Sequence, residues 1–370
     1  MKSICHLTSA HSRYDTRIFL KECRSLANHG YAVTLIVADG KGEEVRDGVR
    51  IVDAGISKGR VDRIRNATAR VLSLAIKIQA NVYHLHDPEL IPAGLKLKRL
   101  GKKVIFDAHE DLPKQLLTKP YLNKAAKIVL SKGLAAYEKW ACSKFDGIVA
   151  ATPVISEKFL KIHKWSLDIN NFPMIGELAT DKVSWESKKK HVCYVGNITR
   201  IRGINEVLEA FSSVNSGVRL KLVGDFSDTS LAQAAFANPG WRNVDALGFL
   251  NREAVRDVLS QSVAGLVTFL PSPNHTDAQP NKMFEYMSAG LPVIASNFPL
   301  WKEIIEGNKC GLCVDPLDPS AIAAAIDYLV DHPAEAERMG RNGQSAVNSR
   351  YNWALEESKL CDFYERVLKG

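Results

Sequence analysis

The chain has 370 residues, 46% of them hydrophobic and 24% charged, which is enough for two domains of ordinary size. This composition excludes wholesale disorder, and no apolar run is long enough to span a bilayer. The seven cysteines are scattered and odd in number, which argues against a disulfide framework. Since the N-terminus enters a strand directly, without a signal-peptide core, we expect a cytoplasmic protein.

The net charge of +8 is unevenly shared along the chain. Residues 1–171 carry 29 Lys and Arg against 17 Asp and Glu, a net of +12, which leaves 20 against 24, a net of −4, for the rest. A basic first half points to an anionic surface or substrate. No helix-turn-helix, zinc or aromatic RNA-binding signature supports nucleic acid, so anionic lipid heads or a lipid-linked pyrophosphate acceptor fit better.

Short apolar strands alternate with helical stretches, such as Arg17–Asn28 and Arg60–Gln79, from end to end of the chain. This alternation predicts an α/β protein with doubly wound parallel sheets. The strands expected in the first half are Ser3–Leu7, Ala32–Val37, Val82–Leu85, Val104–Asp107 and Gly147–Ala150. Those expected in the second half are His191–Val195, Val218–Val223, Val263–Thr268, Pro292–Ala295 and Gly311–Val314.

A polar stretch separates the two halves, so we predict two Rossmann-like domains with a cleft between them. The boundaries are 1–170 for the first domain, 171–190 for a linker, 191–350 for the second domain and 351–370 for a last helix. Within the first domain, Lys114–Lys144 alternates lysines with apolar residues. It is either a helix that lies on an anionic membrane or a core-packed helix with a solvated basic face.

Polar side chains follow two strands of the first half. Ligands of open α/β sheets bind beyond the carboxyl ends of the strands, where His86 and the Asp107-Ala108-His109 segment lie. A single histidine is more often a structural hydrogen-bonding group, but two strand ends with histidine and acid favour a functional site. The loop after the first strand adds His11, Arg13 and Arg17 as side chains for acceptor or phosphate contacts.

In the second half, the loop Gly196-Asn197-Ile198-Thr199-Arg200-Ile201-Arg202-Gly203 joins a strand to a helix. A glycine after a strand, two arginines and a glycine that opens a helix are suited to a diphosphate. The alternative is a basic surface loop, and the glycine spacing alone is weak support. Because no dinucleotide fingerprint follows the first strand, a dehydrogenase is disfavoured.

The most informative stretch is Asp277–Ser296, which holds two carboxylates eight residues apart, Asp277 and Glu285. A helix is expected over Asn281–Ala289, with Gly290 as its stop signal. Lys282 and the backbone N–H groups of this helix start suit a phosphate. The carboxylates are then placed to bind sugar hydroxyls, unless Glu285 only pairs with a cation on a solvated helix face.

This stretch resembles the retaining glycosyltransferases of family 4, of the bacterial surface-polysaccharide type, which have the GT-B fold. The family signature is an acidic residue, seven residues and Glu, then a small residue-Gly-x-Pro-Val turn; here it is Asp277-x7-Glu285 with Ala289-Gly290-Leu291-Pro292-Val293. Two departures are Asp277, where Glu is usual, and Asn197, where Arg is usual. The resemblance implies two Rossmann-like domains whose parallel sheets face a central cleft, and a last helix that returns to the N-terminal domain.

The resemblance also implies the roles of the site residues. His109, Asp277, Arg200 and Arg202 would be catalytic, with His109 and Asp277 beside the transferred sugar. The nucleotide-sugar would be bound by Gly196, Asn197, Arg200, Arg202, Gly224, Phe249, Leu250, Asn281, Lys282 and Glu285. We expect no metal and no cofactor, because the arginines would neutralise the leaving nucleoside diphosphate.

The implied reaction moves a sugar from a nucleotide diphosphate sugar, with a UDP-sugar favoured, to a hydroxyl of a glycan or lipid-linked acceptor at the inner membrane face. Two alternatives stay open at this point. One is a GT-B-like sugar-nucleotide epimerase, which would convert the donor without an acceptor. The other is a sugar-nucleotide-binding scaffold of weak activity, which would bind the donor without turnover.

Overall fold

The computed structural model describes residues 1–117, 123–178 and 185–369. The chain forms two compact units, one made of Met1–Asn171 and Trp353–Gly370 and the other of Phe172–Asn352. Parts of two predicted segments, 118–122 of the basic stretch and 179–184 of the linker, lie outside the described residues, as does Gly370. None of the described helices is long and apolar enough to cross a bilayer.

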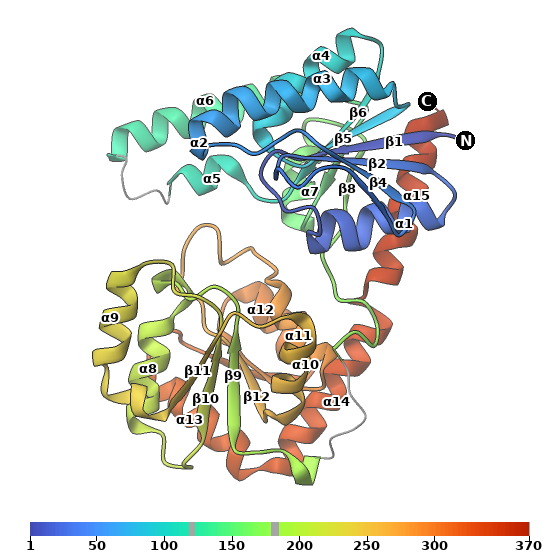
Figure 1. The fold of residues 1–370 in the computed structure, drawn as a ribbon. Coiled ribbons are helices and arrows are strands. Elements are labelled where there is room, and N and C mark those ends of the chain that lie inside the picture. Colours follow the sequence, from blue (N-terminus) through green and yellow to red (C-terminus); the bar gives the residue numbers. More distant parts are fainter. Residues whose placement is uncertain (118–122, 179–184, 370) are drawn as a thin grey trace. The chain divides into compact units, whose positions relative to one another are not determined.

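The first unit is built on an eight-stranded sheet of order β3-β4-β2-β1-β5-β6-β7-β8, parallel except for the β3–β4 pair. Figure 1 labels most of these strands and the helices of the unit. Its strands are β1 (Ser3–Leu7), β2 (Ala32–Val37), β3 (Glu44–Arg46), β4 (Val49–Asp53), β5 (Val82–Leu85), β6 (Lys103–Ala108), β7 (Gly147–Ala150) and β8 (Ser166–Asp168). Apolar runs such as Gly147–Ala150 are buried throughout, as expected for strands covered on both faces.

The helices of the first unit fall between these strands, except for the last. They are η1 (Thr16–Cys23), α1 (Arg24–Asn28), α2 (Gly59–Asp62), η2 (Arg63–Ala67), α3 (Thr68–Ile78), η3 (Pro88–Leu90), α4 (Ile91–Arg99), α5 (Leu112–Leu117), α6 (Lys124–Cys142), α7 (Pro153–Leu160) and α15 (Trp353–Lys369). The helix predicted over Arg17–Asn28 is η1 followed by α1, and η1 is a π-helical segment.

The C-terminal helix α15 packs within the first unit, although its residues follow the second unit in sequence. Trp353 Nε1 donates a hydrogen bond to Ser25 Oγ at 2.9 Å, and Lys103 Nζ donates to the Val367 carbonyl at 2.7 Å. Farther along α15, the fully buried Tyr364 reaches β5. The first unit is therefore made from both ends of the chain.

The second unit has a six-stranded parallel sheet of order β11-β10-β9-β12-β13-β14. Its strands are β9 (His191–Val195), β10 (Arg219–Val223), β11 (Val244–Gly248), β12 (Ala264–Val267), β13 (Val293–Ser296) and β14 (Gly311–Val314). Its helices are η4 (Trp185–Ser187), η5 (Arg200–Arg202), α8 (Ile204–Ser213), α9 (Thr229–Ala237), η6 (Pro239–Asn243), α10 (Arg252–Gln261), α11 (Asn281–Ser288), α12 (Pro299–Ile305), α13 (Pro319–Asp331) and α14 (Pro333–Ser349).

The core of the second unit lies on both faces of its sheet. Along β9, Val192 and Tyr194 join one apolar cluster while Cys193 joins the other, because successive side chains of a strand point to opposite faces. Phe172 and Leu178, from the segment predicted as a linker, are buried in one of these clusters. That part of the segment belongs to the second unit.

Candidate active site

Three of the residues predicted to bind the donor directly follow the carboxyl ends of strands of the second unit. Gly196 comes after β9, Gly224 after β10 and Phe249 after β11, and Thr268, which was not predicted, follows β12. Because these strands are parallel, their carboxyl ends share one edge of the sheet, which is where ligands of such sheets bind. We call it the C-terminal edge of the second sheet.

Gly196 lies between two cations at this edge. A methyl group added at Gly196 would be 3.6 Å from Lys282 Nζ and 3.9 Å from Arg202 Nη1. Arg202 Nη1 also donates to the Asn197 carbonyl at 3.2 Å, which fixes the direction of the guanidinium group. The structure thus brings together Gly196, Arg202 and Lys282, whereas the predicted Arg200 lies exposed in η5.

Lys282 is a buried cation without a carboxylate contact among the described residues. Its ammonium lies 3.8 Å from the centre of the Tyr194 ring and 5.4 Å from that of Phe269, and it makes no hydrogen bond within the described part of the chain. Burial, and then the charge of Arg202, lower the pKa of Lys282 to about 7. The charge of Glu285 offsets this lowering only in part, and a buried charge without a hydrogen bond is costly, so this site favours an anion beside Lys282.

Three further polar atoms near this edge are buried without a hydrogen-bond partner in the described residues. They are Thr199 Oγ1 in the loop after β9, Thr268 Oγ1 after β12 and Gln279 Oε1 before α11. Buried polar groups are normally satisfied by protein, water or ligand. Sequence reasoning missed these three side chains, since a single threonine or glutamine carries no signal by itself.

Two glycines let the backbone segments of this edge approach closely. Gly203 has φ +77°, and a Cβ there would lie 1.9 Å from the Thr268 carbonyl oxygen. Gly224 has φ +128°, and a Cβ there would lie 2.2 Å from the Gly196 carbonyl oxygen. Both the backbone angle and the space therefore require glycine at these positions.

Glu285 lies within α11, whose observed range of Asn281–Ser288 ends one residue before the predicted one. Arg252 Nη1 donates to Glu285 Oε1 at 2.7 Å, and Arg252 Nε donates to Glu177 Oε1 at 2.6 Å. The Glu285 side chain is 17% exposed, so it remains accessible while one oxygen is held. Sequence reasoning did not find Arg252, which lies 33 residues earlier.

The remaining predicted residues occupy less constrained positions. Asp277 lies in the turn before α11, and the neighbouring Ala278 carbonyl accepts a hydrogen bond from Trp301 Nε1 at 2.7 Å. Asn281 is exposed as the first residue of α11. After β11, Phe249 is 80% exposed, whereas Leu250 packs partly against the core.

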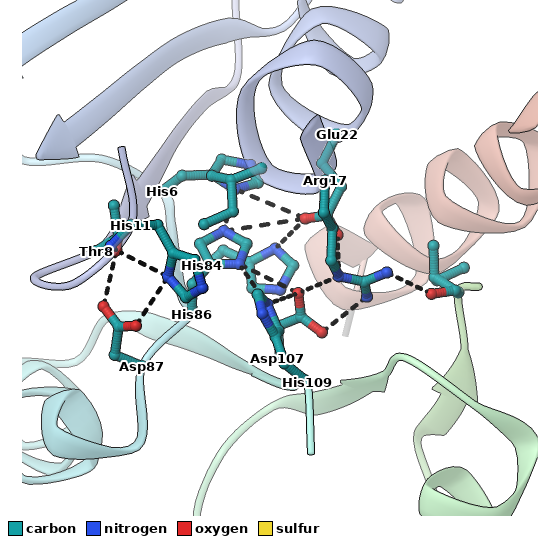
Figure 2. A network of polar contacts seen from close by, with 12 residues as sticks. His6, Thr8, His11, Arg17, Glu22, His84, His86, Asp87, Asp107 and His109 are labelled. Carbon is teal, nitrogen blue, oxygen red and sulfur yellow. Dashed lines mark hydrogen bonds and ion pairs between the residues drawn. The ribbon is translucent and has the colours of Figure 1, made fainter. Parts of the chain in front are cut away.

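The first unit has its own polar edge, at the carboxyl ends of β1, β5 and β6 (Figure 2). Asp107, in β6, is its centre. Arg17 donates Nε and Nη2 to the two oxygens of Asp107, at 2.9 and 2.8 Å, and Oδ2 also contacts His109 Nε2 at 2.8 Å and His86 Nδ1 at 3.1 Å. Although burial opposes ionisation, the charges of Arg17 and His109 and hydrogen bonds from both histidines hold the pKa of Asp107 well below its usual range.

This arrangement fixes one ring nitrogen of His109 and leaves the side chain 21% exposed. Beside it, the rings of His109 and His11 have centres 5.1 Å apart. His11 Nδ1 contacts Asp87 Oδ1 at 2.9 Å, and Asp87 Oδ2 accepts from Thr8 Oγ1 at 2.8 Å (Figure 2). Two partly exposed imidazoles, each held by a buried carboxylate, are thus neighbours.

The two arginines of the same loop have internal partners. Arg13 pairs with Asp39 and Glu44, at 2.7 Å each, and Arg17 is held by Asp107. Both guanidinium groups are about 5% exposed. Of the three side chains predicted in this loop for substrate contacts, the structure therefore favours His11.

Two α/β units, each with a mainly parallel sheet and with polar groups at the carboxyl ends of its strands, define an enzyme of the GT-B class. Two family models match this chain: "Glycosyl transferases group 1" over residues 177–346 and "Glycosyltransferase Family 4" over residues 16–165. The chain belongs to the glycosyltransferases of family 4, and it is an enzyme that uses nucleotide sugars.

Individual relatives agree with this class. The D-rhamnosyltransferase WbpZ of Pseudomonas aeruginosa is 26% identical over 281 residues, 72% of this chain and 68% of the relative. The capsular polysaccharide biosynthesis glycosyltransferase CapM of Staphylococcus aureus is 24% identical over 186 residues, 48% of this chain and 46% of the relative. Among solved structures, HepE of Anabaena in complex with UDP and glucose has a TM-score of 0.76 at 12% identity, over 99% of this chain and 100% of HepE.

Proposed function

We propose that this enzyme transfers a sugar from a UDP-sugar to a hydroxyl of a glycan or lipid-linked acceptor, with retention at the anomeric carbon and without a metal in the transfer step. The observation that supports this best is the pair of cations beside Gly196. Lys282 is buried and has no hydrogen-bond partner among the described residues, and Arg202 directs its guanidinium group to the same glycine.

The leaving group, a nucleoside diphosphate, carries negative charge and can therefore pair with these two cations. Lys282 and Arg202 neutralise charge as the bond to the sugar breaks, in a site where burial strengthens electrostatic interactions. The described groups of His, Asp and Glu that are close enough to bind a metal lie in the first unit, not at this edge. We therefore assign phosphate neutralisation to side chains.

The other parts of the donor fit the same edge. Glu285, held on one oxygen by Arg252, is placed to accept hydrogen bonds from ribose hydroxyls, and the exposed ring of Phe249 offers a face to the base. Uracil is favoured because HepE, which shares the fold, was solved with UDP. Asp277 and the backbone before α11 remain the proposed contacts of the sugar.

In the first unit, we assign to His109 the orientation of the transferred sugar, because Asp107 holds its ring through Nε2 and leaves the side chain partly exposed. His109→Gln should lower turnover about 100-fold, the typical effect of removing a positioned catalytic group. The affinity for UDP should stay the same, because the diphosphate contacts lie in the second unit. The control is His29→Gln, an exposed histidine of the first unit.

The acceptor assignment has two supports. CapM, a relative, is named for capsular polysaccharide synthesis. In addition, α6 exposes Ile128, Val129 and Trp140 between lysines, as a helix at an anionic membrane does. The enzyme should sediment with phosphatidylglycerol vesicles and not with phosphatidylcholine vesicles. The double variant Lys132→Glu/Lys139→Glu should lose this binding, and Lys77→Glu/Lys96→Glu, with exposed lysines of α3 and α4, should keep it.

The direct test is a donor screen with UDP-, GDP-, ADP- and dTDP-sugars, each with and without a panel of glycan acceptors. We expect nucleotide release that depends on acceptor, and an α-configured donor should give an α-linked product by NMR. An inverted product contradicts retention, and conversion of the donor without acceptor favours an epimerase. Binding without turnover across the full panel favours a scaffold.

A further inference from the structure

Four side chains of types that bind metals, three histidines and one glutamate, meet in the core of the first unit, beneath the edge that holds His109. They are His6 of β1, Glu22 of η1, His84 of β5 and His86 directly after β5, and each is at most 1% exposed. One ligand atom from each lies within 4.8 Å of the others (Figure 2). The parallel register of β1 and β5, which sets His6 opposite His84, brings the histidines together.

Glu22 is the anomaly in this cluster. Neither carboxylate oxygen makes a hydrogen bond with the described residues, and its nearest nitrogen, Arg17 Nε, lies 3.2 Å from Oε1 in an ion pair. Oε2 lies 3.9 Å from His6 Nδ1, 3.8 Å from His84 Nδ1 and 3.9 Å from His86 Nε2. These distances are too long for hydrogen bonds, yet they leave room for one ion about 2.0–2.2 Å from each atom.

The outer partners of two of the imidazoles follow the pattern of a metal site. His86 Nδ1 is held by Asp107 at 3.1 Å, and His6 Nε2 by the Tyr364 hydroxyl at 3.3 Å. The same hydroxyl lies 2.7 Å from His84 Nδ1, a hydrogen bond that ligation of this nitrogen would replace. Imidazoles that bind metals almost always have their other ring nitrogen held by a carboxylate or another polar group.

The nitrogens that face Glu22 are the candidates for ligation, namely His6 Nδ1, His84 Nδ1 and His86 Nε2. His6 Nδ1 and His86 Nε2 share a hydrogen bond of 2.8 Å, which a bound ion would replace. The fully buried Glu22 carboxylate has no hydrogen bond with the described residues, which is a sign of a missing ligand, because such a group is costly in a protein-only network.

We propose that His6, Glu22, His84 and His86 bind one divalent transition-metal ion, with Zn²⁺ as the ion that three imidazoles and a carboxylate suit best. Four protein ligands and no exposure describe a closed, structural site rather than a catalytic one. The ion joins β1, β5 and η1 and, through Tyr364, the C-terminal helix α15. It departs from the expectation of a metal-free protein, but it leaves the phosphate contacts of the second unit to side chains.

The test measures metal in the full chain, purified without a polyhistidine tag. Elemental analysis should find one Zn²⁺ per chain, and Co²⁺ added to chelator-treated protein should give the visible absorption of a tetrahedral site. Thermal stability should fall after chelation and return with Zn²⁺. His84→Gln and Glu22→Gln should lower the affinity for Zn²⁺ about tenfold or more. His29→Gln, an exposed control, should keep it.

Circular dichroism identifies variants that fail to fold, and for these the chelation and Co²⁺ results on the wild-type chain decide. The proposal is overturned if the wild-type chain, supplied with Zn²⁺ or Co²⁺, binds neither. It is overturned equally if folded His84→Gln binds as much metal as the wild type. In either event the buried gap holds water or only protons, and the donor site is unaffected.

Discussion

The polar edges of the two units differ in how their buried cations are paired. In the first unit, the buried cation Arg17 is held by Asp107 with two hydrogen bonds, and the imidazoles of His11 and His109 each contact a buried carboxylate. In the second unit, buried Lys282 faces aromatic rings. The buried cation of the first edge is therefore paired by a carboxylate of its own unit, whereas the second edge is built for an anion that comes from outside.

The largest expected effect tests the closed network of the first unit. Arg17→Met removes the cation from buried Asp107, which should cost about 3–5 kcal/mol of unfolding free energy, as when one partner of a buried ion pair is lost. Arg24→Met is the matched control, because Arg24 pairs with Asp47 in an exposed contact, worth about 0–1 kcal/mol. Urea denaturation measures both. Equal losses would show that the Arg17 network is not a closed, stabilising one.

Lys282→Met tests the open edge and should give the opposite pattern. The affinity for UDP should fall about 100-fold, since one buried contact to a charged ligand is lost, about 3 kcal/mol. The melting temperature should stay the same or rise, because a buried unpaired ammonium is replaced by an apolar side chain of similar length. Lys302→Met, at an exposed position of α12, is the control. A large loss of stability without loss of affinity contradicts the ligand role of Lys282.

Arg252→Gln sharpens the role of the Glu285 contact. Without Arg252 the carboxylate keeps its charge but loses the hydrogen bond that orients it, so UDP affinity should fall about tenfold, near 1.4 kcal/mol. Arg256→Gln, four residues further along α10, should change it little because its contact with Glu253 is exposed. Calorimetric titration measures both variants. An unchanged affinity in Arg252→Gln would mean that Glu285 does not need this support.

The smallest effect is in pH dependence. Free Lys282 has a pKa of about 7, and a bound diphosphate raises the pKa of its ammonium, so UDP binding takes up a proton. Affinity should therefore fall as the pH rises through 7, about fivefold from pH 7 to 8 by mass action on one titrating group. Titrations in buffers of different ionisation enthalpy count the proton. Lys282→Met should show neither the uptake nor the decline.

Most of the fold was predictable because the strands of buried parallel sheets are short, continuous apolar runs. Six of the ten predicted strands match the structure residue for residue, such as Val82–Leu85 and Gly311–Val314. The strands β3, β4, β8 and β11 were not predicted, because they lie at or next to a sheet edge and carry charge, as in Glu44-Val45-Arg46. Their pairing depends on neighbours that local periodicity does not reveal.

The residues of the candidate sites also divide into those that the sequence predicted and those that it did not. Gly196, Arg202, Lys282 and Glu285 stood out because their motifs are local in sequence. Contacts between residues far apart in sequence could not be predicted in this way. Arg252 lies 33 residues from its partner Glu285, and His6 lies 80 residues from its partner His86. Contacts of this kind follow from strand register and helix packing, so only the folded chain assembles them.

The central claim is that the C-terminal edge of the second sheet binds a nucleoside diphosphate through Lys282 and Arg202. Calorimetric titration of UDP, GDP, ADP and dTDP without added metal tests it most directly, on the wild type, Arg202→Ala and Arg200→Ala. We predict that one nucleotide, UDP, binds tightly, that Arg202→Ala loses this binding, and that Arg200→Ala keeps most of it. If no nucleotide binds, or if both arginine variants bind like the wild type, the edge is not the donor site.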